Sequence, residues 1–331
     1  MKLVKKLYTE LRLKEKQRLI KLIKDKFELE LSKELSLDRV SAPLVVTKDS
    51  GLQDDLSGVE RTVSFDVLKD GRDLEIVQSL AKWKRQALKK YDYKAGEGLY
   101  TDMTAIRRDD KMDETHSIYV DQWDWEKVIL SCDRTEAYLQ DTVRKIVKAI
   151  STTSKMIKQQ TPAGVEMCDD VYFITSQELL DLYPTLSAKE REYEITKKHK
   201  TVFISKIGDK LSHGEPHDMR APDYDDWSLD GDLLVYHEVL DMALELSSMG
   251  IRVDESSLIQ QLIKSHKEER ESLPYHQAII KKELPLTIGG GIGQSRLCMF
   301  LLGRGHIGEV QSSYWDKETL QQCEELGIEL L

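Results

Sequence analysis

The stretch TIGGGIGQSRL, at residues 287–297, places three consecutive glycines and a fourth two residues later ahead of Arg296. Glycine costs backbone entropy on folding, so such a run indicates that something approaches this backbone closely. Exposed N–H groups without side chains suit a flat or phosphorylated ligand, and a tight structural turn explains the run equally well. The segment is not a Walker A loop, and Arg296 takes the last place of a GxGxxG fingerprint.

A charged loop followed by a strand-like segment forms a second candidate, RRDDKMDETHSIYVDQWDWE at residues 107–126. Arg107 opens this segment, and alternation along a strand would place Gln122 and Asp124 on one face. A polar face with one carboxylate suits an ammonium group, and an ordinary solvated face is the alternative interpretation. In either case the aromatic residues of the opposite face would enter the core: Tyr119, Trp123 and Trp125.

Two carboxylates on neighbouring predicted strands form a third candidate, Asp232 and Glu245 in DGDLLVYHEVLDMALELSSMGIR. Oxygen ligands of this kind suit Mg²⁺ carrying a nucleoside triphosphate. Residues 239–253 fit a helix or a strand, and a strand would place Glu245 and Ser247 on one face. The loop HGEPHDMRAPDYDDW, at 213–227, is rich in Asp and His, but Pro216 makes it a poor helical metal site.

Several elements must position these residues. We expect an extended segment over 36–46 that ends near Pro43, and a helix over 79–92 capped by Ser79. Strands are predicted over 116–125, 201–208 and 232–239, and a long amphipathic helix over 135–160. Helices and strands do not alternate regularly, which indicates an α+β fold with an antiparallel sheet.

The overall composition narrows the class of protein. The net charge of −10 argues against a surface that holds duplex nucleic acid, and no run of about 18 apolar residues predicts a membrane span. We expect one catalytic domain over residues 1–331, with an N-terminal helix over about 1–30 and a helical insertion over about 133–165. The four cysteines lack metal-ligand spacing and need no disulfides, so a cytoplasmic location is expected: Cys132, Cys168, Cys298 and Cys323.

The first 26 residues contain ten Lys or Arg residues against three acidic ones, with leucines at helical spacing. A basic amphipathic helix of this kind lies on a membrane surface in some proteins. We favour a surface helix packed on its own domain, and we expect no membrane partner.

Taken in order, these features resemble the three motifs of class II aminoacyl-tRNA synthetases. LDRVSAPLV resembles motif 1, Arg107 with YVDQWDWE resembles motif 2, and ELSSMGIR with GGGIGQSR resembles motif 3. Across nearly the whole chain the resemblance is to ammonia-dependent asparagine synthetases, which lack a tRNA-reading domain. It is carried by QDDLSG, SLAKWKRQ, AGEGLYTDM, YVDQWDWE, SQELL, RAPDYDDW, LSSMGIRVD and TIGGGIGQSRL. Ser295 stands where motif 3 of the synthetases has an acid, and a short loop is expected at 228–232.

The resemblance implies a class II synthetase-like antiparallel sheet flanked by helices, and an activity. The β-carboxylate of aspartate attacks the α-phosphate of ATP, giving β-aspartyl-AMP and pyrophosphate, and ammonia then displaces AMP to give asparagine. ATP, Mg²⁺, aspartate and ammonia are the implied ligands. A homodimer is also implied, with the apolar segment around Pro43 buried at its two-fold contact.

Residue roles follow from the same resemblance. Asp54 would face the incoming nitrogen, Arg107 the α-phosphate, and Arg296 the adenine ring or a phosphate. Lys84 would pair with the α-carboxylate of aspartate. The rest of the implied aspartate site is Ser79, Gln122, Asp124, Asp225 and Ser248. The rest of the implied nucleotide site is Glu245, Leu246, Gly289, Gly290, Gly291 and Gly293, with Asp232 and Glu245 holding Mg²⁺.

Three other functions were weighed against this one. An aspartyl- or asparaginyl-tRNA synthetase-like paralogue remains the alternative, although about 40 residues before motif 1 are too few for an OB-type anticodon module. A glutamine-dependent amidotransferase needs a cysteine nucleophile, and no cysteine occurs before Cys132. An inactive regulatory paralogue would be expected to lose Arg107, Glu245 or Arg296, and all three are present.

Overall fold

A mixed sheet of eight strands is the centre of the protein in the computed structural model, which describes residues 3–4, 7–54, 56 and 60–331. The strand order is β1-β5-β6-β11-β10-β9-β8-β7, and only the two edge pairs, β1 with β5 and β7 with β8, are parallel. The antiparallel centre confirms the α+β prediction. The strands are β1 (Leu37–Arg39), β5 (Gly98–Ile106), β6 (Tyr119–Val128), β7 (Tyr172–Thr175), β8 (Thr201–Ser205), β9 (Asp225–His237), β10 (Met242–Arg252) and β11 (Thr287–Gly293).

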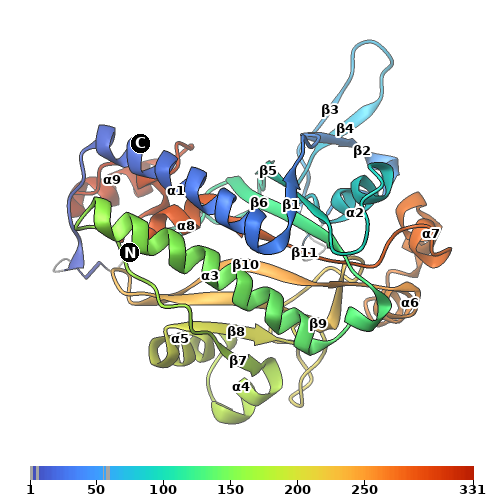
Figure 1. Ribbon diagram of the computed structural model, residues 1–331. Coiled ribbons are helices and arrows are strands. Elements are labelled where there is room, and N and C mark those ends of the chain that lie inside the picture. The colour runs from blue at the N-terminus through green and yellow to red at the C-terminus, as the bar shows by residue number, and fades with distance from the viewer. Residues whose placement is uncertain (1–2, 5–6, 55, 57–59) are drawn as a thin grey trace.

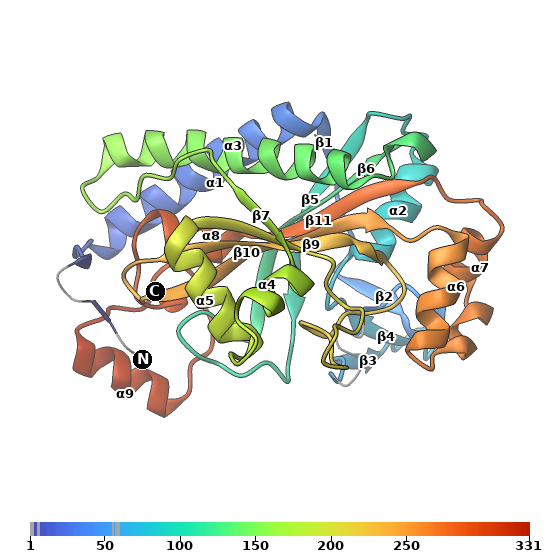
Figure 2. The same cartoon turned by 90° about the horizontal axis from the view of Figure 1, so that it is seen from below.

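Helices cover both faces of this sheet (Figures 1 and 2). Helices α1 and α3 pack on each other over one face, while α2 and the α4–α5 pair lie on the opposite face. Their bounds are α1 (Leu13–Leu35), α2 (Ala81–Lys90), α3 (Glu136–Gln160), α4 (Ser176–Leu182) and α5 (Ala188–His199). The later helices are α6 (Glu255–Lys264), α7 (Pro274–Ile280), α8 (Gln294–Leu301) and α9 (Lys317–Leu326), with the short η2 (Lys48–Ser50), η3 (Ser131–Asp133), η4 (Glu268–Ser272) and η5 (Ile307–Glu309).

Strand alternation divides the sheet into an apolar face and a polar face. On β6, Trp123 and Trp125 are fully buried in the main core, and the Trp123 ring lies 4.7 Å from that of Phe27 on α1. Gln122 and Asp124 project from the other face, as the sequence predicted. Burying two tryptophans under α1 and α3 therefore fixes which β6 side chains are left for a site.

Helix α1 packs its apolar stripe into the protein. Leu19, Ile23, Phe27 and Leu31 recur at helical spacing and lie in the main core with residues of α3 and α8. This confirms the surface-helix interpretation. The helix begins at Leu13 rather than near residue 1, and residues 1–2 and 5–6 of the predicted helix lie outside the described part. No helix in the described residues is long and apolar enough to cross a membrane.

The structure moves several predicted boundaries. Residues 239–253 contain strand β10, not a helix, and the loop expected at 228–232 is instead the interior of the long strand β9. Helix α2 begins at Ala81, so Ser79 lies just before its cap residue, although the Ser79 hydroxyl accepts a hydrogen bond from the Ala81 N–H at 3.3 Å. The long helix predicted at 135–160 is confirmed as α3, whose cap is Thr135.

A small second sheet follows motif 1 in the chain. The extended segment predicted at 36–46 contributes β1 to the main sheet and, beyond Pro43, the start of β2 to the small one. The small sheet has the order β2-β4-β3 within the described residues, and its hairpin projects from the body of the protein (Figure 1). Its strands are β2 (Val45–Thr47), β3 (Ser64–Asp66) and β4 (Asp73–Ile76).

Candidate active site

A cavity of about 560 Å³ lies on the polar face of the sheet. Strands β6, β10 and β11 supply its floor, and α2, the loop after β5 and the segment before β9 supply its walls. All but two of the site residues predicted from the sequence line it, the exceptions being Asp232 and Gly289. Those that line it are Asp54, Ser79, Lys84, Arg107, Gln122, Asp124, Asp225, Glu245, Leu246, Ser248, Gly290, Gly291, Gly293 and Arg296.

The floor of the cavity holds a buried ammonium–carboxylate pair. Lys84 Nζ donates to Asp124 Oδ1 at 2.8 Å and to the carbonyl of Gly290 at 3.0 Å. The other oxygen of Asp124 accepts the Leu80 N–H at 3.2 Å, at the start of α2. Burial lowers the pKa of Lys84, and Asp124 opposes that shift. The pair presents one positive and one negative group side by side, which matches the α-carboxylate and α-ammonium of a free amino acid.

Behind this pair, Arg252 joins several strands through two carboxylates. Its guanidinium donates to Glu126, with Nη2 2.7 Å from Oε2, and to Asp225. Thr287 on β11 donates to the same Glu126 at 2.6 Å. Burial alone would raise the pKa of Glu126, but the charge and hydrogen bonds of Arg252, together with Lys84 and Thr287, lower it. Arg252 and Asp225 reach the cavity, so this network forms its wall as well as its support.

A β-bulge decides which residues of β10 face the cavity. Glu245 pairs with Leu234 of β9, but Ser247 pairs with Leu233, so Leu246 is an extra residue. Strict alternation predicted Glu245 and Ser247 on one face, and this was wrong. Ser247 is buried away from the cavity, whereas Ser248 lines it with Glu245, as the family resemblance implied.

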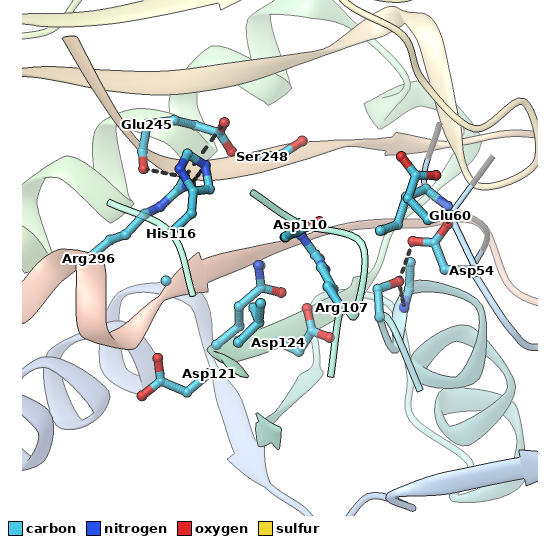
Figure 3. Close-up of a pocket in the computed structure, with 18 of the residues that line it drawn as sticks. Asp54, Glu60, Arg107, Asp110, His116, Asp121, Asp124, Glu245, Ser248 and Arg296 are labelled. Atoms are coloured by element: carbon cyan, nitrogen blue, oxygen red, sulfur yellow. Dashed lines mark hydrogen bonds and ion pairs between the residues drawn. The ribbon is translucent and has the colours of Figure 1, made fainter. Parts of the chain in front are cut away.

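Arg296 lies at one end of the cavity, with Glu245 and His116 beside it (Figure 3). Nη1 donates to the carbonyl of Glu245 at 3.1 Å, and Nε lies 3.4 Å from the carbonyl of Thr115. Nη2 lies 2.6 Å from Nε2 of His116, whose Nδ1 is 2.8 Å from Asp113 Oδ1. If Asp113 holds the proton on Nδ1, Nε2 of a neutral imidazole accepts from Arg296. Every nitrogen of the guanidinium is thus held in place.

Arg107 lies between the two ends of the cavity. It follows the last residue of β5, and its Nε and Nη2 both donate to the carbonyl of Gln78 at 3.2 Å. Figure 3 shows its side chain between the Arg296 end and the Asp54 end. The guanidinium of Arg107 can therefore contact the middle of a ligand that reaches from the Arg296 end to the Asp54 end.

Asp54 is 1% exposed at the end opposite Arg296. Its Oδ2 accepts from the Ser79 hydroxyl at 2.6 Å and its Oδ1 from the Leu56 N–H at 2.9 Å. Burial raises the pKa of Asp54, while the charge of Lys82 opposes the increase. The Leu56 contact is the turn contact that an ordinary Asx-turn makes, and the raised pKa suits a proton acceptor. Residues 55 and 57–59 of the QDDLSG segment lie outside the described residues.

The predicted metal pair lies on neighbouring strands, but only Glu245 lines the cavity. Arg220, which lines the cavity, donates to Asp232 Oδ2, while Asp232 Oδ1 is buried without a hydrogen-bond partner among the described residues. Burial and the charge of Glu245 raise the pKa of Asp232 to about 7, against the effect of Arg220. Oxygen ligands such as these two carboxylates suit a divalent cation, although no cluster of three or more ligating side chains occurs in the described residues.

The glycine run is a strand that leads into α8, not a tight turn. A Cβ on Gly289 would lie 2.0 Å from Glu126 Oε2, and one on Gly291 would lie 2.5 Å from Gln122 Oε1. These glycines therefore make room for the protein's own polar side chains. Gly290, Gly291 and Gly293 still line the cavity, but Gly289 lies outside its lining, against the sequence expectation.

Sequence reasoning missed several residues of the site. His116, Asp113 and Arg220 were not singled out, because their partners lie on distant segments that no local pattern connects. Asp121 was also missed, and it explains Ser295. Both the N–H and the hydroxyl of Ser295 donate to Asp121, at 3.0 and 2.9 Å, so the residue before Arg296 is held by a carboxylate from β6.

Comparisons with known proteins agree on one family. A family model described as aspartate-ammonia ligase matches residues 14–327. The chain is 57% identical over 325 residues to the aspartate–ammonia ligase of Clostridium tetani, covering 98% of this chain and 95% of that protein. It is 55% identical over 313 residues to the aspartate–ammonia ligase of Fusobacterium nucleatum, covering 94% and 95%.

Solved structures show the likeness of the fold. An asparaginyl-tRNA synthetase of Pyrococcus horikoshii with asparaginyl-adenylate matches with a TM-score of 0.63 at 14% identity, covering 91% of this chain and 70% of that one. The aspartyl-tRNA synthetase of Entamoeba histolytica matches with a TM-score of 0.60 at 14% identity, covering 92% and 58%. At this identity the fold alone is shared, and it is the class II synthetase fold that the motifs predicted.

The Lys84–Asp124 pair gives a stability prediction. Lys84→Met should cost about 3–5 kcal/mol in the free energy of unfolding, because it leaves the Asp124 carboxylate buried without its partner. The double variant Lys84→Met/Asp124→Asn should lose less than the single one, because it removes that carboxylate. Urea unfolding measures both, with Lys89→Met on the exposed surface of α2 as the control. Equal or greater loss in the double variant would show that the pair is not the source of the cost.

Proposed function

The chain belongs to the aspartate–ammonia ligase family and makes asparagine from aspartate and ammonia at the expense of ATP, and we propose that this one cavity carries out both halves of that reaction. In the first half, a β-carboxylate oxygen of aspartate bonds to the α-phosphorus of ATP, and the bond to the departing pyrophosphate breaks. In the second, ammonia bonds to the β-carbonyl carbon of the aspartyl-adenylate, and the bond to AMP breaks.

The single observation that carries the proposal is the layout of charge along the cavity (Figure 3). Arg296, with every guanidinium nitrogen held, lies at one end and Asp54 at the other, and Arg107 and Asp124, the partner of Lys84, lie between them. A linear substrate pair, aspartate followed by ATP, fits that order. The reacting β-carboxylate and α-phosphate would then meet beside Arg107.

The Lys84–Asp124 pair would bind the α-carboxylate and α-ammonium groups of aspartate. Lys84 would pair with the α-carboxylate, and Asp124 with the α-ammonium. The two substrate charges would then take over part of the contact that Lys84 and Asp124 now make with each other. Gln122 and Ser248 offer neutral polar groups on the cavity floor, and Asp225 adds a carboxylate held by Arg252. Ser79 also lines the cavity, and its hydroxyl donates to Asp54.

Arginines would stabilise the adenylation step. Negative charge builds on the α-phosphate oxygens during transfer, and a preorganised cation beside them lowers the barrier. Arg107 would supply this charge. Arg296 would contact the adenine face or a phosphate with its planar group, and Gly290, Gly291 and Gly293 would leave the backbone accessible to the nucleotide.

Glu245 and Asp232 would hold Mg²⁺. Their carboxylates and the unsatisfied Oδ1 of Asp232 fit such a cation, with phosphate oxygens completing its ligands. The bound ion would supply charge neutralisation at the triphosphate. Arg220 now occupies one Asp232 oxygen, so it must share or give up that contact when the ion is bound.

Asp54 would serve the ammonia-dependent half. Ammonia is mostly protonated to ammonium at neutral pH. A carboxylate at the Asp54 end of the cavity can attract this cation and accept one proton from it. The freed ammonia then attacks the β-carbonyl carbon. Adenylation needs no such base, because the attacking aspartate carboxylate is already an anion.

We also propose a homodimer that buries the segment around Pro43. Leu44, which follows Pro43, is 52% exposed in the single chain. Light scattering at micromolar protein should therefore give twice the 38.2 kDa chain mass. A fully active protein with the monomer mass would contradict this.

Arg296→Lys should be damaging although it keeps the charge. A lysine cannot reproduce contacts made by all three guanidinium nitrogens, and it cannot stack as a planar group. We expect the KM for ATP to rise at least about tenfold and pyrophosphate exchange to fall with it. Arg18→Lys, on the exposed side of α1, is the matched control. Ordinary ATP kinetics in the folded Arg296→Lys protein would assign Arg296 a structural role only.

Asp54→Asn should separate the two half-reactions. The amide keeps the size and much of the turn hydrogen bonding but removes the base, whose help is worth about 10²–10⁴-fold in rate. Aspartate-dependent ATP–pyrophosphate exchange should stay near the wild-type rate, while asparagine formation falls by about two orders of magnitude. The exposed Asp49→Asn is the control.

Two other outcomes of the Asp54→Asn experiment are informative. A parallel loss of both activities would mean that Asp54 binds substrate or supports its loop. No loss of either would make Asp54 a turn residue and place the base elsewhere.

A further inference from the structure

A buried charged cluster lies behind the Asp54 end of the cavity. Asp223 Oδ2 accepts from Lys82 Nζ at 2.8 Å and from Arg270 Nη1 at 3.0 Å, and it lies 2.9 Å from His276 Nε2. Asp223 and His276 are 0% exposed and Lys82 is 3% exposed. Lys82, Asp223 and His276 are not among the residues that line the cavity, so direct contact with a substrate does not explain the cluster.

Lys82 connects this cluster to the loop that carries Asp54. Its Nζ also donates to the backbone carbonyl of Gln53, the residue before Asp54, at 2.9 Å. From the same end of α2, the Ser79 hydroxyl donates to the Asp54 side chain. The start of one helix therefore holds Asp54 at two points, through the backbone of its loop and through its carboxylate.

The same ammonium acts on the charge of Asp54. Burial raises the pKa of Asp54, Lys82 lowers it, and Asp223 raises it. Asp223 itself remains ionised in spite of burial, because the positive groups around it hold its pKa well below the usual range. Two neighbours thus act on the Asp54 carboxylate with opposite signs.

Other groups packed at this end act on the same balance. Arg270 from η4 and His276 from α7 contact Asp223. Tyr224, next to Asp223 in the chain, stays neutral, because burial and the Asp54 charge raise its pKa well above the usual value. Glu60 lines the cavity at this end as well (Figure 3). Lys82 contacts the Asp54 loop directly, through the carbonyl of Gln53.

We infer that Lys82, anchored by Asp223, is a positioning residue for the ammonia-dependent half-reaction. It fixes the loop that carries Asp54, and it supplies the positive charge that keeps this buried side chain ionised and ready to accept a proton. The inference rests on the proposed role of Asp54 as the base. It assigns no substrate contact to Lys82, so adenylation of aspartate should not depend on its charge.

Two variants test the inference with opposite expected signs. Lys82→Met removes the cation, so the titration of Asp54 should move to higher pH by about 1–3 units. Asp223→Asn removes the opposing negative charge, so the titration should move to lower pH. Carbon-13 NMR of protein labelled at the aspartate carboxyl carbons measures both in the absence of substrates, with Asp54→Asn identifying the signal.

Kinetics provide the second measurement. The acid limb of asparagine formation should follow the Asp54 titration upward in Lys82→Met, while the pH profile of pyrophosphate exchange stays in place. Lys82→Arg keeps the charge and should restore the wild-type profile. Lys90→Met removes the same charge from the exposed surface of α2 and should move neither profile.

Several results would overturn the inference. An unmoved Asp54 titration in Lys82→Met would do so, as would equal loss of both half-reactions without a shift of the acid limb. If Lys82→Met does not fold, Asp223→Asn decides, and a titration that fails to move down contradicts the inference. Failure of the base proposal itself is separate: it would appear as normal asparagine formation in Asp54→Asn, whereas the NMR titration still reports on Lys82.

Discussion

The buried guanidinium of Arg252 is the interaction on which the site depends. It joins β10 to Glu126 on β6 and to Asp225 at the start of β9, and Thr287 on β11 completes the contacts of Glu126. Removing one member of such a network leaves the remaining charges buried and unpaired, which is costly. The central strands of the sheet are thereby held in one register, and that register sets the spacing of the cavity floor.

The division of the sheet into two faces explains how a stable core and a charged cavity share the same strands. Trp123 and Trp125 enter the core, whereas Gln122 and Asp124, which alternate with them, face the cavity. The bulge in β10 changes that alternation at one point and brings Ser248 beside Glu245. The likeness to tRNA synthetases therefore lies in the sheet and its helices, whereas the activity depends on the side chains that this fold carries.

Local patterns in the sequence predicted the antiparallel α+β fold and the polar face of β6, and the resemblance to asparagine synthetases supplied most of the site residues that the structure brings to the cavity. They failed where long-range contacts decide the outcome. Strict alternation misplaced Ser247 because a bulge is a property of the strand pair. Gly289 was attributed to a ligand because nothing in the sequence shows that Glu126 fills its space. The contacts of His116 with Arg296 and of Arg220 with Asp232 join segments that only the fold brings together.

The central claim is that one cavity first activates aspartate and then admits ammonia. ATP–pyrophosphate exchange by the wild-type protein, measured with aspartate but without ammonium or tRNA, tests it most directly. We predict exchange under these conditions, followed by release of asparagine and AMP once ammonium is added. Absence of exchange until ammonium or tRNA is supplied would contradict the separate adenylation step and the division of the cavity on which it rests.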